Sequence, residues 1–192
     1  MTRASQVLAL AAALLFGAPM SHATILSFGG TLSGAAEGTA SPGTGVVAVT
    51  INDVTDMMHV QATFSGLLAN TTAAHIHCCT ASPGTGTAGV ATTTPSFPGF
   101  PLGVTMGSFD ATFDLTMASS YNPAFVTASG GVPQAEDALI AGMLNGRTYF
   151  NIHTTMFPGG EIRAFLVPEP GVMGLLLLGL GAGLVASRRR RV

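Results

Sequence analysis

The 192-residue chain contains no lysine and has few charged residues of either sign. Its basic residues are seven arginines, and all but Arg147 and Arg163 lie among the first three or the last five residues. The middle of the chain therefore lacks a basic patch of the kind that binds phosphates, which excludes nucleic acid as a partner. It also lacks a Ser-His-Asp order, a phosphate-binding loop and a zinc-protease helix motif. We therefore assign no catalytic residue and predict that the protein is not an enzyme.

The N-terminal apolar run carries no charge of its own. Arg3 precedes the run from Val7 to Phe16, and Ser21-His22-Ala23 follows it as a small-x-small cleavage site. This order is typical of a secretory signal peptide. We therefore predict that residues 1–23 are a signal peptide and that the mature chain, starting near Thr24, is exported through the inner membrane.

A second uncharged run lies near the C-terminus. The motif Val167-Pro168-Glu169-Pro170 precedes 17 uncharged residues, 171–187, and a cluster of four arginines. Seventeen residues reach the lower limit for a helix that spans a bilayer, and the arginines would stay on the cytoplasmic side. A permanent single-span anchor explains the span and the arginines but leaves the Pro-Glu-Pro motif without a role.

Residues 168–192 resemble a PEP-CTERM sorting tail, which consists of a Pro-Glu-Pro motif, a short span and a basic end. The resemblance implies processing by an exosortase, as in Gram-negative bacteria that make exopolysaccharide. It further implies that the protein is anchored in the membrane only until it is processed, and then belongs to the cell envelope or the exterior.

Residues 24–167 have the length of one domain. Apolar and polar residues alternate around Val47, Val49 and Ile51 and again from Met58 to Phe64, which indicates half-buried strands. Candidate strands cover residues 25–32, 46–52, 57–67, 73–78, 89–94, 108–115, 147–154 and 161–167. Many short strands joined by turns predict an all-β fold, an antiparallel sandwich or barrel.

One helix is predicted within this strand pattern, at residues 133–144. Pro133 suits a first helical turn, Glu136 and Asp137 favour a helix N-terminus, and Asn145-Gly146 supplies the stop. The apolar residues of the segment fall on one face. We therefore expect a crossover helix that lies across the sheet.

Four potential metal ligands crowd into the stretch AAHIHCCT at residues 73–80: His75, His77, Cys78 and Cys79. On a strand, His75 and His77 share one face and Ile76 lies on the other. Burying Ile76 in the core turns both imidazoles outward. A metal site requires this arrangement, but a solvent-exposed strand also produces it, and the sequence leaves both interpretations open.

A second candidate strand, RTYFNIHT, has the same arrangement. Burying Phe150 and Ile152 turns His153 outward, on the face that also carries Asn151. If the two strands are neighbours, His153 converges with the first two histidines. Imidazole suits copper and zinc, and Asn151 is a candidate partner for the second nitrogen of His153.

Adjacent cysteines in an oxidising compartment leave three alternatives: a vicinal disulfide, separate bonds to partners, or thiols that bind metal. Strand alternation points Cys78 and Cys79 apart and opposes the first alternative. It remains open if the strand ends at His77, and the sequence TASPG that follows favours a turn there.

The remaining polar residues are assigned to solvated surfaces. His59 alternates with core residues and should face solvent. Asp110 and Asp114 share one strand face and indicate a solvated edge rather than an acid-base pair. Glu161 and Arg163 share a strand face as well, and we expect an exposed ion pair there.

Two stretches resemble the chordin-type CHRD domain. AHIHCCTASPGTGTAGV, at residues 74–90, has its His-x-His strand and glycine-rich turn. GRTYFNIHTTMFPGGEIRAFL, at residues 146–166, has its terminal N-x-H-T-x-x-x-P-G-G-E-I-R stretch. The resemblance implies an extracellular all-β domain over residues 24–167, with a binding or structural role and no established catalytic activity. We therefore predict a surface or matrix protein without a cofactor, whose partners are exopolysaccharide or other envelope components.

The same strands resemble Cu/Zn superoxide dismutase. Gly66-Leu67, the His-x-His strand, a Gly-Arg-Thr strand that ends in a histidine, and a later Gly-x-Arg stretch follow in that family's order. The resemblance implies a Greek-key fold, superoxide-dismutase-like or immunoglobulin-like, and copper ligands at His75, His77 and His153. No histidine lies between His77 and His153, so the family's bridging and zinc ligands are missing, and no C-terminal cysteine matches its disulfide. The alternative prediction is a mononuclear copper-binding protein or a superoxide dismutase-like enzyme.

Overall fold

The structure, a computed structural model, describes residues 24–169. The predicted signal peptide and the predicted membrane span lie outside the described residues. Within residues 24–169, no helix combines the length and the apolar character needed to cross a bilayer. In chain order the elements are β1 (Ile25–Ser33), α1 (Gly34–Glu37), β2 (Thr44–Asn52), β3 (Met57–Ser65), β4 (Thr71–Cys78), β5 (Gly107–Asp114), a 3-10 turn (Ala118–Ser120), α2 (Pro123–Ser129), α3 (Val132–Leu144), β6 (Thr148–Thr154), β7 (Ile162–Phe165) and β8 (Val167–Pro168).

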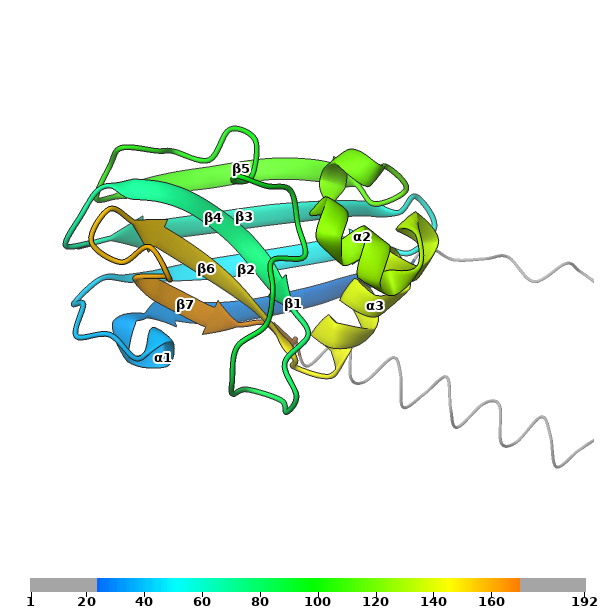
Figure 1. The fold of residues 1–192 in the computed structure, drawn as a ribbon, viewed down its shortest axis with the longest axis horizontal. Coiled ribbons are helices and arrows are strands. Elements are labelled where there is room, and N and C mark those ends of the chain that lie inside the picture. The colour runs from blue at the N-terminus through cyan, green and yellow to red at the C-terminus, as the bar shows by residue number, and fades with distance from the viewer. Residues whose placement is uncertain (1–23, 170–192) are drawn as a thin grey trace, which may run out of the picture.

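One antiparallel sheet contains all the described strands. Its order is β4-β6-β7-β1-β2-β3-β5, and β8 pairs with β1. The sheet curls into a half-barrel in which β1, β2, β3 and β5 lie behind β4, β6 and β7 (Figure 1). The predicted all-β antiparallel sandwich or barrel is therefore confirmed.

The core lies between these two layers, and period-2 alternation decides which side chains enter it. Val49 and Ile51 on β2 and Val60 on β3 are fully buried, which confirms the predicted faces. From the front layer, Ile76 and Phe150 are also fully buried. Their burial fixes which face of β4 and β6 is left for polar side chains.

Among residues 24–169, three helices, two of them not predicted, cover parts of the sheet. The predicted helix is confirmed as α3, which buries Leu139 and Met143, but the expectation that it lies across the sheet is wrong (Figure 1). The missed helix α2 begins at a local signal, because the Asn122 side chain accepts a hydrogen bond from the backbone N–H of Ala124 and Pro123 occupies the first turn. Both helices lie at one end of the sandwich (Figure 1).

The long segment 79–106, between β4 and β5, runs back along the free edge of β4. The backbone N–H of Cys78 donates to Gly89 O at 3.1 Å, and Phe97 N–H donates to Ala74 O at 3.0 Å. These bonds satisfy groups that an edge strand would leave unpaired. The predicted strand at residues 89–94 is wrong, because this segment pairs only at single bridges, one of which joins Val90 to His77.

Candidate metal centre

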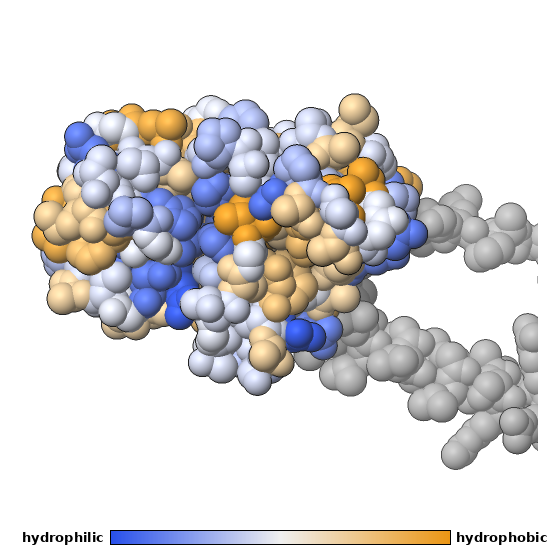
Figure 2. Space-filling view, in the orientation of Figure 1, coloured by the Kyte–Doolittle hydropathy of each residue, from blue (hydrophilic) through white to orange (hydrophobic). Residues whose placement is uncertain are grey.

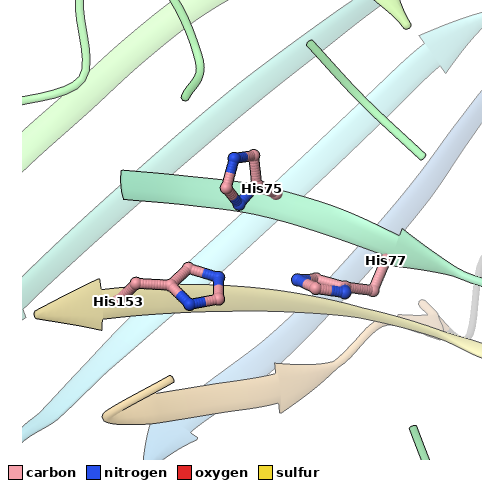
Figure 3. Close-up of side chains that lie close together, drawn as sticks. All are labelled: His75, His77 and His153. Carbon is pink, nitrogen blue, oxygen red and sulfur yellow. The ribbon is translucent and has the colours of Figure 1, made fainter. Parts of the chain in front are cut away.

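The three histidines singled out in the sequence lie together on neighbouring strands (Figure 3). β4 pairs with β6 in antiparallel register, with His75 opposite Asn151 and Ala73 opposite His153. One nitrogen from each of His75, His77 and His153 lies within 4.8 Å of the other two. The imidazole centroids are 5.2 to 5.9 Å apart. The pairing of the two strands, which the sequence could not establish, therefore brings all three rings to one place.

Of the two interpretations that the sequence left open for the outward-turned histidines, the solvent-exposed strand face is not what the structure shows. They lie on the face opposite Ile76, as predicted, yet His75, His77 and His153 are only 6, 7 and 9 % exposed. Segment 79–106 and the turn between β6 and β7 cover this face. The outer face of β4 and β6 is therefore buried by a loop whose sequence has no periodic pattern.

Each ring is held by one hydrogen bond to a backbone carbonyl. His75 Nε2 lies 2.7 Å from Pro95 O, His77 Nδ1 lies 2.9 Å from Ala88 O, and His153 Nδ1 lies 2.9 Å from Pro158 O. A carbonyl can only accept, so each of these nitrogens carries a proton and donates it. For His153 the acceptor is Pro158 rather than Asn151, whose amide points to Gly159 O at 3.4 Å.

The second nitrogen of each ring is left without a partner. His75 Nδ1, His77 Nε2 and His153 Nε2 are buried and make no hydrogen bond. In a neutral imidazole with one N–H, the other nitrogen presents a lone pair. Three lone pairs therefore share one enclosed space, on rings whose tautomers are fixed by backbone carbonyls.

Burial keeps these rings neutral. It lowers the pKa of His75 and of His77 to about 4, against an ordinary value of 6.5, although the hydrogen bond to a carbonyl partly opposes this. It also lowers the pKa of His153. Protons therefore do not compete for the lone pairs near neutral pH, which is the condition for an imidazole to bind metal.

A polar cluster that the sequence did not indicate adjoins the histidines. The Tyr149 ring stacks on His77 with centroids 4.6 Å apart, and the guanidinium carbon of Arg163 lies 4.9 Å from the Tyr149 centroid. Arg163 Nε donates to Ala36 O at 2.6 Å and lies 3.5 Å from Glu37 Oε2. Figure 2 shows hydrophilic residues gathered over β4, β6 and β7 on this face. Glu37 comes from the short helix α1, far away in sequence, and no motif marks it.

The predicted exposed ion pair between Glu161 and Arg163 is wrong. Glu161 is fully buried. Its carboxylate accepts hydrogen bonds from Ser41 Oγ at 2.6 Å, Leu68 N at 2.6 Å and Thr154 Oγ1 at 2.7 Å. Glu161 precedes β7 instead of lying within it, so the alternation that was assumed for this pair does not apply.

The two adjacent cysteines point away from the histidines. Cys78 and Cys79 are joined by a disulfide across a cis peptide bond. β4 ends at Cys78, and both sulfurs face α3, at 3.7 and 3.5 Å from Ala138 O. They lie so close to Gly142 that a Cβ there would be 2.7 Å from either sulfur. The cluster of possible metal ligands in the described part of the chain contains the three histidines and no cysteine.

The other polar residues lie mainly at solvated positions. His59 Nε2 lies 2.7 Å from Asp110 Oδ1 on the outer face of β3 and β5, with side chains 36 and 64 % exposed. The Asp114 carboxylate accepts from Thr116 N–H at 2.9 Å. These positions agree with the predicted solvated faces.

Part of the predicted sorting motif belongs to the sheet. Val167 and Pro168 form β8, opposite Gly29 and Phe28 of β1. Pro170 lies outside the described residues.

A family model described as CHRD domain matches residues 28–166, which are 139 of the 192 residues. Neither a curated protein nor a solved structure matches the chain.

Proposed function

The chain belongs to the CHRD domain family, and from this premise we propose that it is an exported domain that binds one transition-metal ion between His75, His77 and His153. The family indicates an extracellular binding domain. The observation that carries the metal is that the three rings each offer one nitrogen within 4.8 Å of the other two, and that each ring has a buried nitrogen without a hydrogen-bond partner.

The unpaired nitrogens favour a metal ion over an empty site. A buried acceptor without a partner costs about 1–3 kcal/mol, and this site contains three. A water molecule has two hydrogens, so it leaves at least one of the three nitrogens unpaired. One metal ion accepts all three lone pairs at once.

The backbone carbonyls of Ala88, Pro95 and Pro158 complete the arrangement. A histidine ligand usually donates its other N–H to such an acceptor, which fixes the ring orientation and raises its basicity. Imidazole donors suit copper and zinc.

The enclosure of the site favours binding over turnover. The three nitrogens have no contact with solvent. Arg163, the arginine implied by the superoxide dismutase resemblance, is held by Ala36 O, by Gly86 O at 3.1 Å and by Glu37. It is therefore not free to guide an anion to a metal, which is an argument against dismutase activity.

For localisation, we propose the route that the two ends of the sequence indicate. Residues 1–23 direct export, and an exosortase-type enzyme removes the tail near Val167 to Pro170. The domain then reaches the envelope or the exterior, where exopolysaccharide is the proposed partner. Intact mass of the protein from its host should lack residues 171–192, and recovery of only the full-length membrane form would refute this route.

The metal proposal is tested by stripping the purified protein with a chelator and reloading it with Cu(II), Cu(I) or Zn(II). We expect one metal ion per chain by elemental analysis. His75→Ala, His77→Ala and His153→Ala should each abolish binding, and the exposed-site control His59→Ala should retain it. Binding that is absent, or that survives His153→Ala, would refute a shared three-histidine site.

A further inference from the structure

We infer that the three-histidine site selects monovalent copper, Cu(I), over divalent ions. This inference rests on the proposed metal-binding function and adds the charge state of the ion. It follows from the number of donors, from their charge, and from the charges that surround them.

The site offers three donors, and Cu(I) needs fewer ligands than Zn(II) or Cu(II). Among the described residues, the group of possible ligands consists of His75, His77 and His153 alone. Zn(II) in proteins is almost always bound by four ligands, and Cu(II) prefers a tetragonal set. Cu(I) has a filled d shell and no geometric preference of that kind, so three nitrogens are sufficient for it. A divalent ion would have to take its fourth ligand from solvent.

The donors also bring no negative charge. Three neutral imidazoles leave the full charge of the ion uncompensated in an enclosed space. The free energy of burying an ion grows with the square of its charge, so a divalent ion has about four times the penalty of a monovalent one. A site built to hold a divalent ion would be expected to include a carboxylate or a thiolate.

The nearest charged groups do not supply the missing negative charge. Glu37 is the acidic residue of the adjoining polar cluster, and it lies 3.5 Å from the Arg163 guanidinium. Arg163 in turn stacks on Tyr149, which stacks on His77. The positive guanidinium offsets the carboxylate and lies on the side of the histidines, so the surroundings add no attraction for a second unit of charge.

Competition assays measure the preference directly. Metal-free protein is titrated against bicinchoninate, a chromogenic Cu(I) chelator, with hydroxylamine as reductant so that the Cys78–Cys79 disulfide stays intact. A thiol titration verifies the disulfide afterwards. Zn(II) and Cu(II) are measured against chelators of known affinity. We expect the protein to bind Cu(I) more tightly than either divalent ion, and His77→Ala to lose that binding.

A charge substitution beside the site tests the reason for the preference. Asn151 lies directly opposite His75 in the sheet. Asn151→Asp adds one negative charge beside the site, partly offset by Arg163, its partner on β7, and should raise divalent affinity relative to Cu(I) by about tenfold. The matched control is Asn52→Asp on β2, where the side-chain oxygen accepts from Val54 N and Thr55 N and a carboxylate can do the same. The control should leave the ratio unchanged.

The outcomes separate this inference from the proposed function. Divalent binding at one ion per chain that equals or exceeds Cu(I) binding overturns the Cu(I) inference and leaves the metal site standing. Failure to bind any of the three ions overturns both. If Asn151→Asp does not fold, a second measurement on the unaltered protein decides the matter. Oxidising the Cu(I) complex in the presence of EDTA should release the copper, and retention of Cu(II) would overturn the inference.

Discussion

Replacing Glu161 by alanine should destabilise the domain strongly, because this buried carboxylate joins three separate parts of the chain. It accepts from Ser41 Oγ and Leu68 N, both at 2.6 Å, and from Thr154 Oγ1 at 2.7 Å. Each buried donor left without a partner costs about 1–3 kcal/mol. Part of this destabilisation is offset, because the substitution also removes the cost of burying the carboxylate. We expect a net loss of about 3–5 kcal/mol from the free energy of unfolding.

The loss should appear in urea unfolding followed by far-ultraviolet circular dichroism, which is suitable because the chain has no tryptophan. The control Asp137→Ala removes an exposed carboxylate from α3 and should change stability by less than about 0.5 kcal/mol. Glu161→Gln keeps an acceptor for Ser41 and Leu68 and should fall between the two. A loss in Glu161→Ala no larger than that of the control would refute the assigned role of the carboxylate.

The same substitution should weaken metal binding without touching a ligand. Glu161 holds Thr154 and follows directly after the turn that contains Pro158, whose carbonyl orients His153. Loosening this turn should lower metal affinity in Glu161→Ala and leave it unchanged in Asp137→Ala. Equal affinity in the two variants would mean that the turn does not position His153.

Three further results are expected. Burial lowers the pKa of His75 and His77 from 6.5 to about 4, so the unfolded chain binds more protons than the folded chain between these two pH values. The free energy of unfolding of the metal-free domain should therefore be highest above pH 6.5 and fall by about 2–3 kcal/mol per histidine on acidification to pH 4. A free energy of unfolding in urea that does not change between these pH values would contradict this. Gly142→Ala sets a Cβ 2.7 Å from each sulfur of the disulfide and should cost about 1–3 kcal/mol despite the better helix propensity of alanine, whereas Gly89→Ala meets open space and should cost less. Phe150→Ala should cost about 3–5 kcal/mol and His59→Ala less than about 1 kcal/mol, and similar losses for both would mean that the faces of β6 and β3 are misassigned.

Local periodicity predicted the faces of the strands but not what covers them. Ile76 and Phe150 enter the core because alternation on a strand is a property of the local backbone. The burial of His75 and His77 depends on segment 79–106, which reaches them through single backbone contacts that leave no pattern in the sequence. The convergence with His153 depends on the pairing of β4 with β6, which is determined by the tertiary fold and not by the local sequence.

Two errors have specific local causes. Glu161 was assigned to a strand that begins one residue later, at Ile162, so the alternation assumed for its side chain does not apply to it. α2 has too little apolar periodicity to predict a helix, although Asn122-Pro123 supplies a helix start that could have indicated it. The polar cluster with Glu37 had no such signal, because α1 and β7 meet only in the folded sheet.

X-ray diffraction from metal-loaded crystals, recorded on both sides of the copper absorption edge, tests the central claim most directly. The account predicts one strong anomalous peak per chain, about 2.0–2.1 Å from His75 Nδ1, His77 Nε2 and His153 Nε2, with the other ring nitrogens still bonded to their carbonyls. The absence of a peak among the three rings, in crystals that contain copper elsewhere, would contradict it.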